Sequence, residues 1–285
     1  MLDDIPALSI PEGVPALLRD LIHDRLGIHF EADRFELMLE KLRDRAIFHG
    51  CRSYLDYYFI LKYEEKGVGE WLRVMDAFSV QETYFWREFS QIESLIQFVV
   101  PAWFKTHAAP LRIWSAACAS GEEPYTIVMA LHEAGLGHLP IEVFASDASE
   151  AALTRARAGV YRERSFRALP EALRQKYFTA VPEGWKLNPA IARRVRFERA
   201  NLVNPGEIAQ LATVPVIFCR NVFIYFSADS IRRTVDMFAQ RMTGHGHLFV
   251  GSSESLLKLT QEFLLEEMGD AFVYVRKPRS VSAHP

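Results

Sequence analysis

The segment Ser115-Ala-Ala-Cys-Ala-Ser-Gly-Glu-Glu-Pro-Tyr125 decides the fold of this chain. It overlaps the apolar run of residues 111–117, which predicts a buried strand. The small residues Ala119-Ser-Gly121 let a ligand approach the backbone, and a helix is expected over residues 124–134 with Pro124 in its first turn. A strand, a glycine turn and a helix in this order are typical of an α/β sheet that binds a ligand beyond its strand ends.

The acidic residues after the glycine turn indicate the charge of that ligand. Glu122 and Glu123 suit the positive end of a helix dipole but would repel a phosphate, and no Lys-Ser or Lys-Thr pair follows. A nucleoside triphosphate is therefore disfavoured, and a cationic adenosyl ligand is favoured near Ala117, Gly121 and Glu123. Alternatively, Gly121 is only a turn residue and the glutamates only complement the dipole, and the spacing alone favours neither interpretation.

Predicted strands and helices alternate along the rest of the chain. Further strands are expected at 141–146, 195–198, 214–219, 247–251 and 271–275, and further helices at 92–104, 150–157 and 230–242. Such alternation predicts an α/β fold with a mainly parallel, doubly wound sheet covered by helices. The last two strands are expected to form a closing pair.

A smaller helical domain is expected before this sheet. Apolar residues recur at helical spacing from residue 15 to about residue 74, and Gly67-Val-Gly69 is expected to interrupt the pattern before a last short helix at 71–78. The expected divisions are a helical domain at 1–78, a linker at 79–90, a second domain at 91–276 and a disordered tail at 277–285.

Composition excludes several classes of protein. A net charge of -3 disfavours a general binder of nucleic acid or anionic membranes. Cys51, Cys118 and Cys219 are odd in number and lack metal-ligand spacing, so neither a disulfide framework nor a metal site is expected. The acidic N-terminus lacks a signal-peptide pattern, and no apolar run is long enough to span a bilayer. We therefore expect a cytoplasmic protein that is neither exported nor inserted in a membrane.

Polar residues follow two of the predicted strands at the edge where a ligand is expected. Asp147 comes after the strand at 141–146, where an acidic residue commonly bonds ribose hydroxyls. Alternatively, Asp147 or Ser149 caps the next helix. Asn201-Leu202 follows the strand at 195–198, where the amide either reads the edge of adenine or occupies a turn.

A third pair of polar residues is the least compatible with ordinary core packing. Arg220-Asn221 directly follows an apolar strand and precedes an aromatic-rich segment that contains Tyr225. This arrangement favours a binding site.

Several long motifs together resemble the chemotaxis receptor methyltransferase (CheR) family over nearly the whole chain. They are Gln81-Glu-Thr-Tyr-Phe-Trp-Arg87, Ser120-Gly-Glu-Glu-Pro-Tyr125, Ala145-Ser-Asp147, Ala156-Arg-Ala-Gly-Val-Tyr161, Ile217-Phe-Cys-Arg-Asn-Val-Phe-Ile-Tyr-Phe226 and Gly251-Ser-Ser-Glu254. The resemblance implies a class I S-adenosylmethionine-dependent methyltransferase domain with a Rossmann-like sheet, a small N-terminal all-helical domain, and an inserted antiparallel β-subdomain at about 162–200.

The resemblance also implies a set of site residues. The cofactor S-adenosylmethionine is expected to contact Gln81, Thr83, Arg87, Glu123, Asp147, Asn201, Leu202, Arg220 and Asn221. Arg87 and Tyr225 match the family positions beside the transferred methyl group, so they are the expected catalytic residues. The alternatives are a structural salt bridge at the domain junction for Arg87 and a core position for Tyr225. Gln81 replaces the usual asparagine, Pro215 the frequent aspartate and Ser252 the common histidine, and His245 interrupts the usual pair of glycines.

The implied activity is transfer of a methyl group to glutamate carboxylates of a chemoreceptor, which yields methyl esters and S-adenosylhomocysteine. Lys41 and Arg45, with Arg34 at helical spacing, are expected to dock the acidic receptor helices, or else to belong to a solvated face that nearby acids partly neutralise. Members of the family that tether to a receptor's C-terminal peptide carry a longer, glycine-rich insertion. The insertion of this chain is short, with Gly184 alone, so the resemblance predicts no need for that tether. The alternatives are a catalytically silent docking module that binds S-adenosylmethionine and a small-molecule O-methyltransferase.

Overall fold

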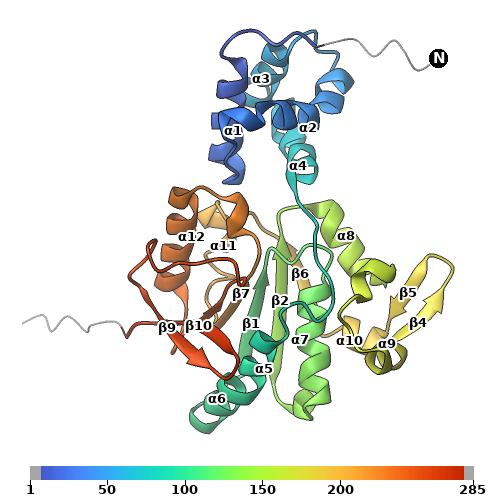
Figure 1. Ribbon diagram of the computed structural model, residues 1–285, viewed down its shortest axis with the longest axis vertical. Coiled ribbons are helices and arrows are strands. Elements are labelled where there is room, and N and C mark those ends of the chain that lie inside the picture. The colour runs from blue at the N-terminus through green and yellow to red at the C-terminus, as the bar shows by residue number, and fades with distance from the viewer. Residues whose placement is uncertain (1–7, 279–285) are drawn as a thin grey trace, which may run out of the picture.

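The N-terminal region folds because apolar residues recur on one face of each of its helices. In the computed structural model, which describes residues 8–278, these helices are α1 (Val14–Leu26), α2 (Phe35–Phe48), α3 (Tyr54–Tyr63) and α4 (Lys66–Phe78). Leu18, Met38 and Tyr57, from three different helices, are fully buried in one cluster. The all-helical domain is therefore present as expected, and it stands above the strand ends of a larger α/β domain (Figure 1). Of the expected tail, residues 279–285 lie outside the described part.

The expected interruption at Gly67-Val-Gly69 was wrong, because α4 runs through it from Lys66. Gly67 packs directly on the end of α3, where a Cβ atom would lie 2.4 Å from the carbonyl oxygen of Ile60. The glycine thus permits a close approach of two helices rather than a break.

The larger domain is built on a sheet whose strands run mainly parallel. The strands are β1 (Leu111–Ala116), β2 (Ile141–Asp147), β6 (Val195–Arg199), β7 (Val216–Cys219), β8 (His247–Phe249), β9 (Phe263–Met268) and β10 (Ala271–Arg276). Their order is β6-β2-β1-β7-β8-β10-β9, and the first five are parallel to one another. β10 pairs antiparallel with both β8 and β9, so the expected closing pair is confirmed. β9 was not expected, because it is an edge strand whose middle residues are exposed and show no alternation.

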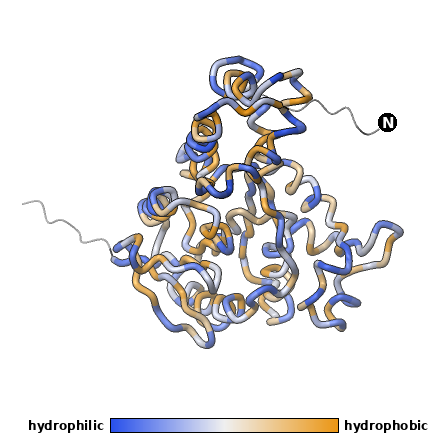
Figure 2. The backbone as a smooth tube through the Cα atoms, turned by 45° about the horizontal axis from the view of Figure 1, so that its top comes forward, coloured by the Kyte–Doolittle hydropathy of each residue, from blue (hydrophilic) through white to orange (hydrophobic). Residues whose placement is uncertain are grey.

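Helices cover both faces of the sheet. One face carries α5 (Ser90–Ser94), α6 (Val100–Thr106), α7 (Glu122–Glu133) and α8 (Glu150–Ala158), and the other carries α11 (Pro205–Ile208) and α12 (Ala228–Arg241). Ile113 and Trp114 of β1 are both fully buried on opposite faces, which is why this strand is continuously apolar. Hydrophobic stretches accordingly run through the middle of the α/β domain, while hydrophilic ones lie on its outer helices and turns (Figure 2).

A second, antiparallel sheet is inserted between α8 and β6. It comprises β3 (Val160–Tyr161), β4 (Phe178–Val181) and β5 (Gly184–Leu187) in the order β3-β5-β4, together with α9 (Glu171–Tyr177) and α10 (Pro189–Ala192). The insertion ends earlier than the expected residue 200, because Val195 pairs with Val143 in the main sheet.

Among residues 8–278, no helix is long and apolar enough to cross a membrane.

A buried acid links three helices of the N-terminal domain. Glu70 of α4, only 4% exposed, accepts hydrogen bonds from Nε of Arg45 at 2.7 Å and from the hydroxyl of Tyr57 at 2.7 Å, and His49 Nε2 lies 2.8 Å away. Burial raises the pKa of Glu70, but the bonds from Arg45, His49 and Tyr57 outweigh it and hold the pKa at about 2.

These contacts correct the expected basic docking face. Arg45 is committed to Glu70, and Lys41 Nζ donates to the carbonyl oxygen of Ala77 at 3.0 Å. Both cations therefore make contacts within the helical domain. Of the three basic residues, Arg34 alone is exposed.

Replacement of Glu70 by glutamine should destabilise the helical domain and change its pH dependence. Loss of the charge that pairs with Arg45 is expected to lower the free energy of unfolding by about 3 kcal/mol at neutral pH. Because the folded pKa lies below the unfolded value, the Glu70 contribution is complete above pH 4.5 and is lost as the pH falls towards 2. Urea unfolding followed by circular dichroism should therefore show a difference between wild type and Glu70→Gln that shrinks over this range.

The matched control is Glu40→Gln on the exposed face of α2, which is expected to change the unfolding free energy by less than about 0.5 kcal/mol. A Glu70→Gln effect that is small, or that stays constant as the pH falls, would contradict the role of the buried carboxylate.

Candidate active site

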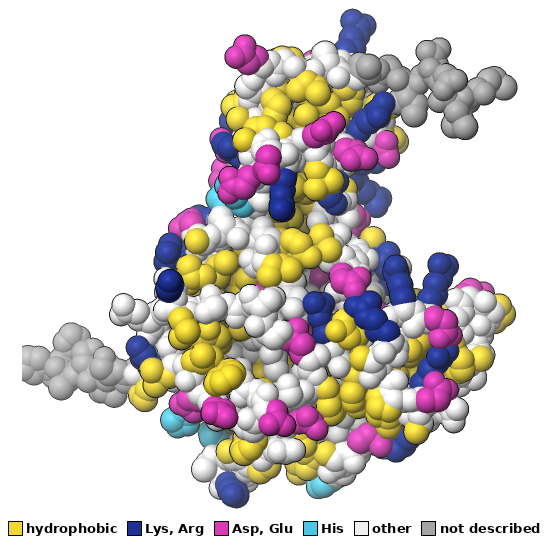
Figure 3. All heavy atoms as spheres, viewed as in Figure 1, with side chains coloured by type: hydrophobic (Ala, Val, Ile, Leu, Met, Phe, Trp, Pro, Cys, Tyr) yellow, Lys and Arg dark blue, Asp and Glu magenta, His cyan; other side chains and the backbone are white. Residues whose placement is uncertain are grey.

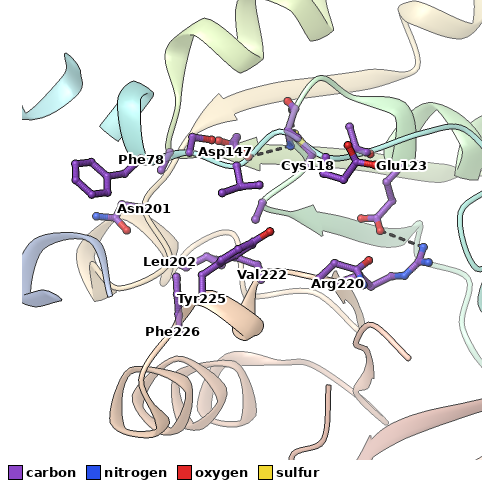
Figure 4. A pocket seen from close by; sticks show the side chains of 18 of the residues that line it. Phe78, Cys118, Glu123, Asp147, Asn201, Leu202, Arg220, Val222, Tyr225 and Phe226 are labelled. Atoms are coloured by element: carbon purple, nitrogen blue, oxygen red, sulfur yellow. Dashed lines mark hydrogen bonds and ion pairs between the residues drawn. The ribbon is translucent and has the colours of Figure 1, made fainter. Parts of the chain in front are cut away.

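A cavity lies where the carboxyl ends of the parallel strands meet the helical domain. Its empty space, including the open mouth, is about 1060 Å³. The strand ends contribute Ala117, Cys118, Ala119, Asp147, Ala148, Ala200, Asn201, Leu202, Arg220, Asn221 and Val222, the linker contributes Ser79, Val80, Glu82, Thr83, Tyr84 and Arg87, and the helical domain contributes Leu26, Ile28, Met75 and Phe78. Figure 4 places Phe78 and Asn201 at one end of the cavity and the pair Glu123 and Arg220 at the other, with Asp147 between them.

The backbone around this cavity is strained. Within residues 8–278, positive φ angles at non-glycine residues occur at Trp86 (66°), Glu88 (46°), Ala117 (56°), Ala119 (47°) and Asn221 (58°). Three of these residues line the cavity and the other two flank Arg87. Such conformations persist only where the surroundings hold them, and they tend to gather at functional sites.

Asp147 joins the ends of β1 and β2. One carboxylate oxygen accepts the N–H of Ala119 at 2.9 Å, and the other accepts the N–H of Ser149 at 2.8 Å. Ser149, whose hydroxyl accepts the N–H of Ala152, is the residue that caps α8. Burial raises the pKa of Asp147, although these backbone hydrogen bonds oppose the rise. A carboxylate has about four acceptor sites, so Asp147 still has acceptor capacity for a ligand hydroxyl.

Arg220 is buried at the end of β7 and is surrounded by acceptors. Its Nη1 lies 3.2 Å from Glu123 Oε2, and its Nη2 donates to the carbonyl oxygen of Arg87 at 2.7 Å and lies 3.4 Å from Glu88. Burial raises the pKa of Glu123, and the charge of Arg220 and a 2.6 Å hydrogen bond from Ser115 oppose this effect. The buried Nε of Arg220 has no hydrogen-bond partner among the described residues.

Glu254 holds the loop that follows β7. Its carboxylate accepts four backbone N–H groups, from Gly251 at 2.6 Å, Asn221 at 2.8 Å, Phe223 at 2.7 Å and Ile224 at 3.3 Å. This loop carries Tyr225, whose ring and hydroxyl extend into the cavity (Figure 4). Burial raises the pKa of the Tyr225 hydroxyl, so that it stays protonated at neutral pH.

The helical domain closes the cavity through contacts with the same loops. The N–H of His29 donates to the carbonyl oxygen of Tyr225 at 3.1 Å, and Asn201 Nδ2 donates to the carbonyl oxygen of Arg25 at 2.7 Å. Gly27 has a φ of 73°, and a Cβ atom there would lie 2.4 Å from Val203. On the other side of the cavity, the hydroxyl of Ser149 donates to Asp76 at 2.6 Å.

The structure gathers most of the expected site residues around one cavity. Those that line it are Thr83, Arg87, Ala117, Glu123, Asp147, Asn201, Leu202, Arg220, Asn221 and Tyr225. Gln81 and Gly121 do not line it. Gln81 Nε2 donates to the hydroxyl of Ser149 at 3.5 Å. Gly121 has a φ of 91°, and there is no room for a side chain there, because a Cβ atom would lie only 2.9 Å from Ala156. Gly121 therefore shapes the turn and its packing on α8.

Sequence reasoning missed two groups of residues. Phe78, Leu26 and Ile28 reach the cavity only through docking of the helical domain, and no local pattern marks them. Glu88 and Glu254 carry a weak signal, since each lies in or directly beside a quoted motif. Glu88 accepts a hydrogen bond from Asn221 Nδ2 at 3.2 Å and another from the N–H of Ser252 at 2.9 Å.

The sheet order, the helices on both faces and the ligand cavity at the strand ends define a class of protein, the Rossmann-like S-adenosylmethionine-dependent methyltransferases. Residues 81–272 match the family described as CheR methyltransferase, SAM binding domain, and residues 16–79 match its all-alpha domain. The chain belongs to the CheR methyltransferase family.

Curated relatives agree with this assignment over most of their length. A protein of Vibrio cholerae serotype O1 named chemotaxis protein methyltransferase 2 is 35% identical, with 93% of each chain covered. Chemotaxis protein methyltransferase 1 of Pseudomonas aeruginosa is 33% identical, with 92% of this chain and 97% of the relative covered. A solved magnesium protoporphyrin IX methyltransferase from Synechocystis is 14% identical, with 77% of this chain and 94% of that chain covered and a TM-score of 0.38.

Replacement of Glu254 by glutamine should loosen the loop that carries Asn221 and Tyr225. Both carboxylate oxygens accept backbone N–H groups, so the amide nitrogen of glutamine would face donors. Loss of these charge-assisted bonds corresponds to about 1.5–3 kcal/mol, so the affinity for S-adenosylhomocysteine in isothermal titration calorimetry should fall by about tenfold to a hundredfold. Glu266→Gln, on the exposed face of β9, is the matched control. An unchanged affinity in Glu254→Gln would rule out this positioning role.

Proposed function

We propose that this protein transfers the methyl group of S-adenosylmethionine to glutamate side chains of a chemoreceptor, yielding glutamate methyl esters and S-adenosylhomocysteine. Family membership and two relatives named chemotaxis protein methyltransferases support the proposal. The observation that carries it is the chemistry of the cavity. Its lining includes the guanidinium of Arg87 but no histidine or lysine, and its largely buried carboxylates, Asp147 and Glu123, already accept hydrogen bonds within the chain.

The lack of a base favours an acceptor that is already ionised. Neither histidine nor lysine is among the residues that line the cavity. Glu82 lines it, but a hydrogen bond from Arg167 and the charge of that arginine hold the pKa of Glu82 below its ordinary value, which makes it a poor base. A substrate amine or hydroxyl would have to lose a proton to become a nucleophile, whereas a glutamate carboxylate has none to lose at neutral pH.

The cavity fits S-adenosylmethionine by charge and polarity. The carboxylate of Asp147, at the end of the second strand, would accept ribose hydroxyls. Glu123 complements the ammonium group of the methionine end, and the unpartnered Nε of Arg220 complements its carboxylate. At the opposite end, the apolar side chains of Phe78 and Leu202 would enclose the adenine (Figure 4).

Alignment is the main task left to the chain. When bound, S-adenosylmethionine would supply a sulfonium-linked methyl group for in-line attack by a substrate carboxylate oxygen. An O–CH₃ bond would form as the S–CH₃ bond breaks, and the electron pair would leave with the sulfur of S-adenosylhomocysteine. The chain's residues hold the reactants in this geometry and exclude water from the carboxylate. The Tyr225 ring projects into the cavity, where its face can interact with a sulfonium.

Arg87 is the residue best suited to hold the substrate carboxylate. Within the described chain, its one side-chain hydrogen bond goes to the carbonyl oxygen of Glu82 at 2.8 Å, and its distance to Glu88 is a long 3.9 Å. Most of its five N–H donors therefore remain for a ligand. This arrangement disfavours the alternative of a purely structural salt bridge.

Transfer of label from methyl-labelled S-adenosylmethionine to purified receptor cytoplasmic fragments tests the activity. Base-labile label on the fragment, mapped to glutamate by mass spectrometry, is the expected result. Cofactor binding without label would instead indicate a silent docking module, and label confined to small metabolites would indicate a small-molecule methyltransferase.

Arg87→Lys refines the same assay. Lysine keeps the charge but loses the planar fork, so kcat/KM for the receptor fragment is expected to fall by about tenfold to a hundredfold, with a smaller change in affinity for S-adenosylhomocysteine. An unchanged kcat/KM would exclude Arg87 from the reaction.

We also propose that the enzyme acts without a tether to the receptor's C-terminal peptide. The short β4–β5 hairpin, in which Pro182 and Glu183 alone join the two strands, supports this proposal. A fluorescently labelled C-terminal receptor peptide should show no rise in anisotropy when the enzyme is added at micromolar concentration, and saturable tight binding would contradict the proposal.

A further inference from the structure

Two exposed arginines of the inserted subdomain lie near linker residues that line the cavity. Arg164 and Arg167 are exposed, and they lie in and directly after the short turn η4 (Glu163–Phe166). Figure 3 shows lysine and arginine side chains collected on this face, in the hollow below the helical domain. Neither arginine belongs to the expected set of site residues.

The turn that carries them is fixed to the active-site linker. The carbonyl oxygen of Ser165 accepts the N–H of Phe85 at 2.9 Å, and its hydroxyl donates to the buried Glu122 at 3.0 Å. The ring of Phe166 stacks on Phe85 with 5.5 Å between the ring centroids. The backbone that carries the two arginines is therefore anchored to the linker at Phe85, two residues before Arg87.

Arg167 and Arg87 both lie near one aromatic ring of the cavity wall. The Arg167 guanidinium lies 3.7 Å from the centroid of the Tyr84 ring, and that of Arg87 lies 5.5 Å from it. Arg167 also forms an ion pair with Glu82 at 2.5 Å, and both Glu82 and Tyr84 line the cavity. The surface thus already holds one carboxylate next to the reaction site.

The charges of this surface do not cancel. Arg167, Arg87 and Arg164 all act on Glu82 and lower its pKa, so three cations surround one anion. The nearby Glu163 is paired with Arg174 and accepts a hydrogen bond from Trp185 at 3.0 Å, so it does not neutralise them. Glu88, which lies 3.9 Å from Arg87, counts beside Glu82, so the excess is about one positive charge. Lys41 and Arg45 of the helical domain are engaged internally.

We propose that Arg164 and Arg167, together with Arg87, form a docking surface for the acidic residues that flank the target glutamate of the protein substrate. This inference rests on the proposed function and names the surface that recognises its substrate. Arg87 holds the reacting carboxylate, while Arg164 and Arg167 attract neighbouring acids and set the register of the substrate helix. Complementary charges of this kind raise association rates and specificity, and salt weakens them.

The test uses the full-length enzyme with the charge-reversing pair Arg164→Glu and Arg167→Glu. KM for an acidic receptor fragment is expected to rise by at least about tenfold at low ionic strength, and the difference from wild type should shrink at about 0.5 M salt. The value of kcat and the affinity for S-adenosylhomocysteine should change little. Lys258→Glu, an exposed charge reversal in the loop between β8 and β9, is the matched control and should leave KM unchanged.

Two further variants keep the test decisive. If the charge-reversed enzyme does not fold, Arg164→Gln with Arg167→Gln should give a smaller rise in KM in the same direction. A receptor fragment whose flanking acids are replaced by lysines should lose activity with wild type and regain it with the charge-reversed enzyme. If the wild type is active and KM is unchanged in both double variants, the proposed docking surface is wrong but the proposed function stands. If the wild type labels no receptor fragment, the proposed function itself is wrong.

Discussion

A single buried guanidinium organises the active site. Arg220 is 7% exposed at the end of β7, and a cation removed from water costs several kcal/mol unless acceptors surround it. Its acceptors come from distant parts of the chain: Glu123 at the start of α7, Glu88 in the linker and the carbonyl oxygen of Arg87. The contacts that Arg220 makes with Arg87 and Glu88 therefore hold the linker against the sheet and fix the backbone position of Arg87.

Backbone strain around that charge is held by acids that take no part in the chemistry. Asn221 adopts a left-handed conformation because Glu254 accepts its N–H and Glu88 accepts its side-chain amide. On the other side, Asp147 accepts the N–H of the similarly strained Ala119. These carboxylates fix the strand-end loops before any ligand binds, which is the condition for precise alignment of two reactants.

Charge is used differently in the two smaller parts of the molecule. In the helical domain, Arg45 pairs with the buried Glu70 inside the domain. The apolar residues Leu26, Ile28, Met75 and Phe78 of the same domain line the cavity. In the inserted subdomain, Phe166 and Ser165 anchor the turn. Arg164 and Arg167 stay exposed on this turn, and Arg167 also pairs with Glu82. The helical domain thus shapes the site, and the subdomain presents the charge that we propose attracts the substrate.

The sequence by itself determined the sheet, its helical cover and the strand ends where Asp147 and Arg220 belong, because burial on both faces and glycine turns leave local patterns in the chain. It missed β9, whose exposed edge imposes no pattern, and it misjudged Gly67 and Arg45. The roles of these residues depend on which distant segment of the chain packs against them. Only the tertiary structure decided which partner each charged side chain has. A charged residue on a helix face gives the same sequence pattern whether it faces solvent or pairs with a buried acid.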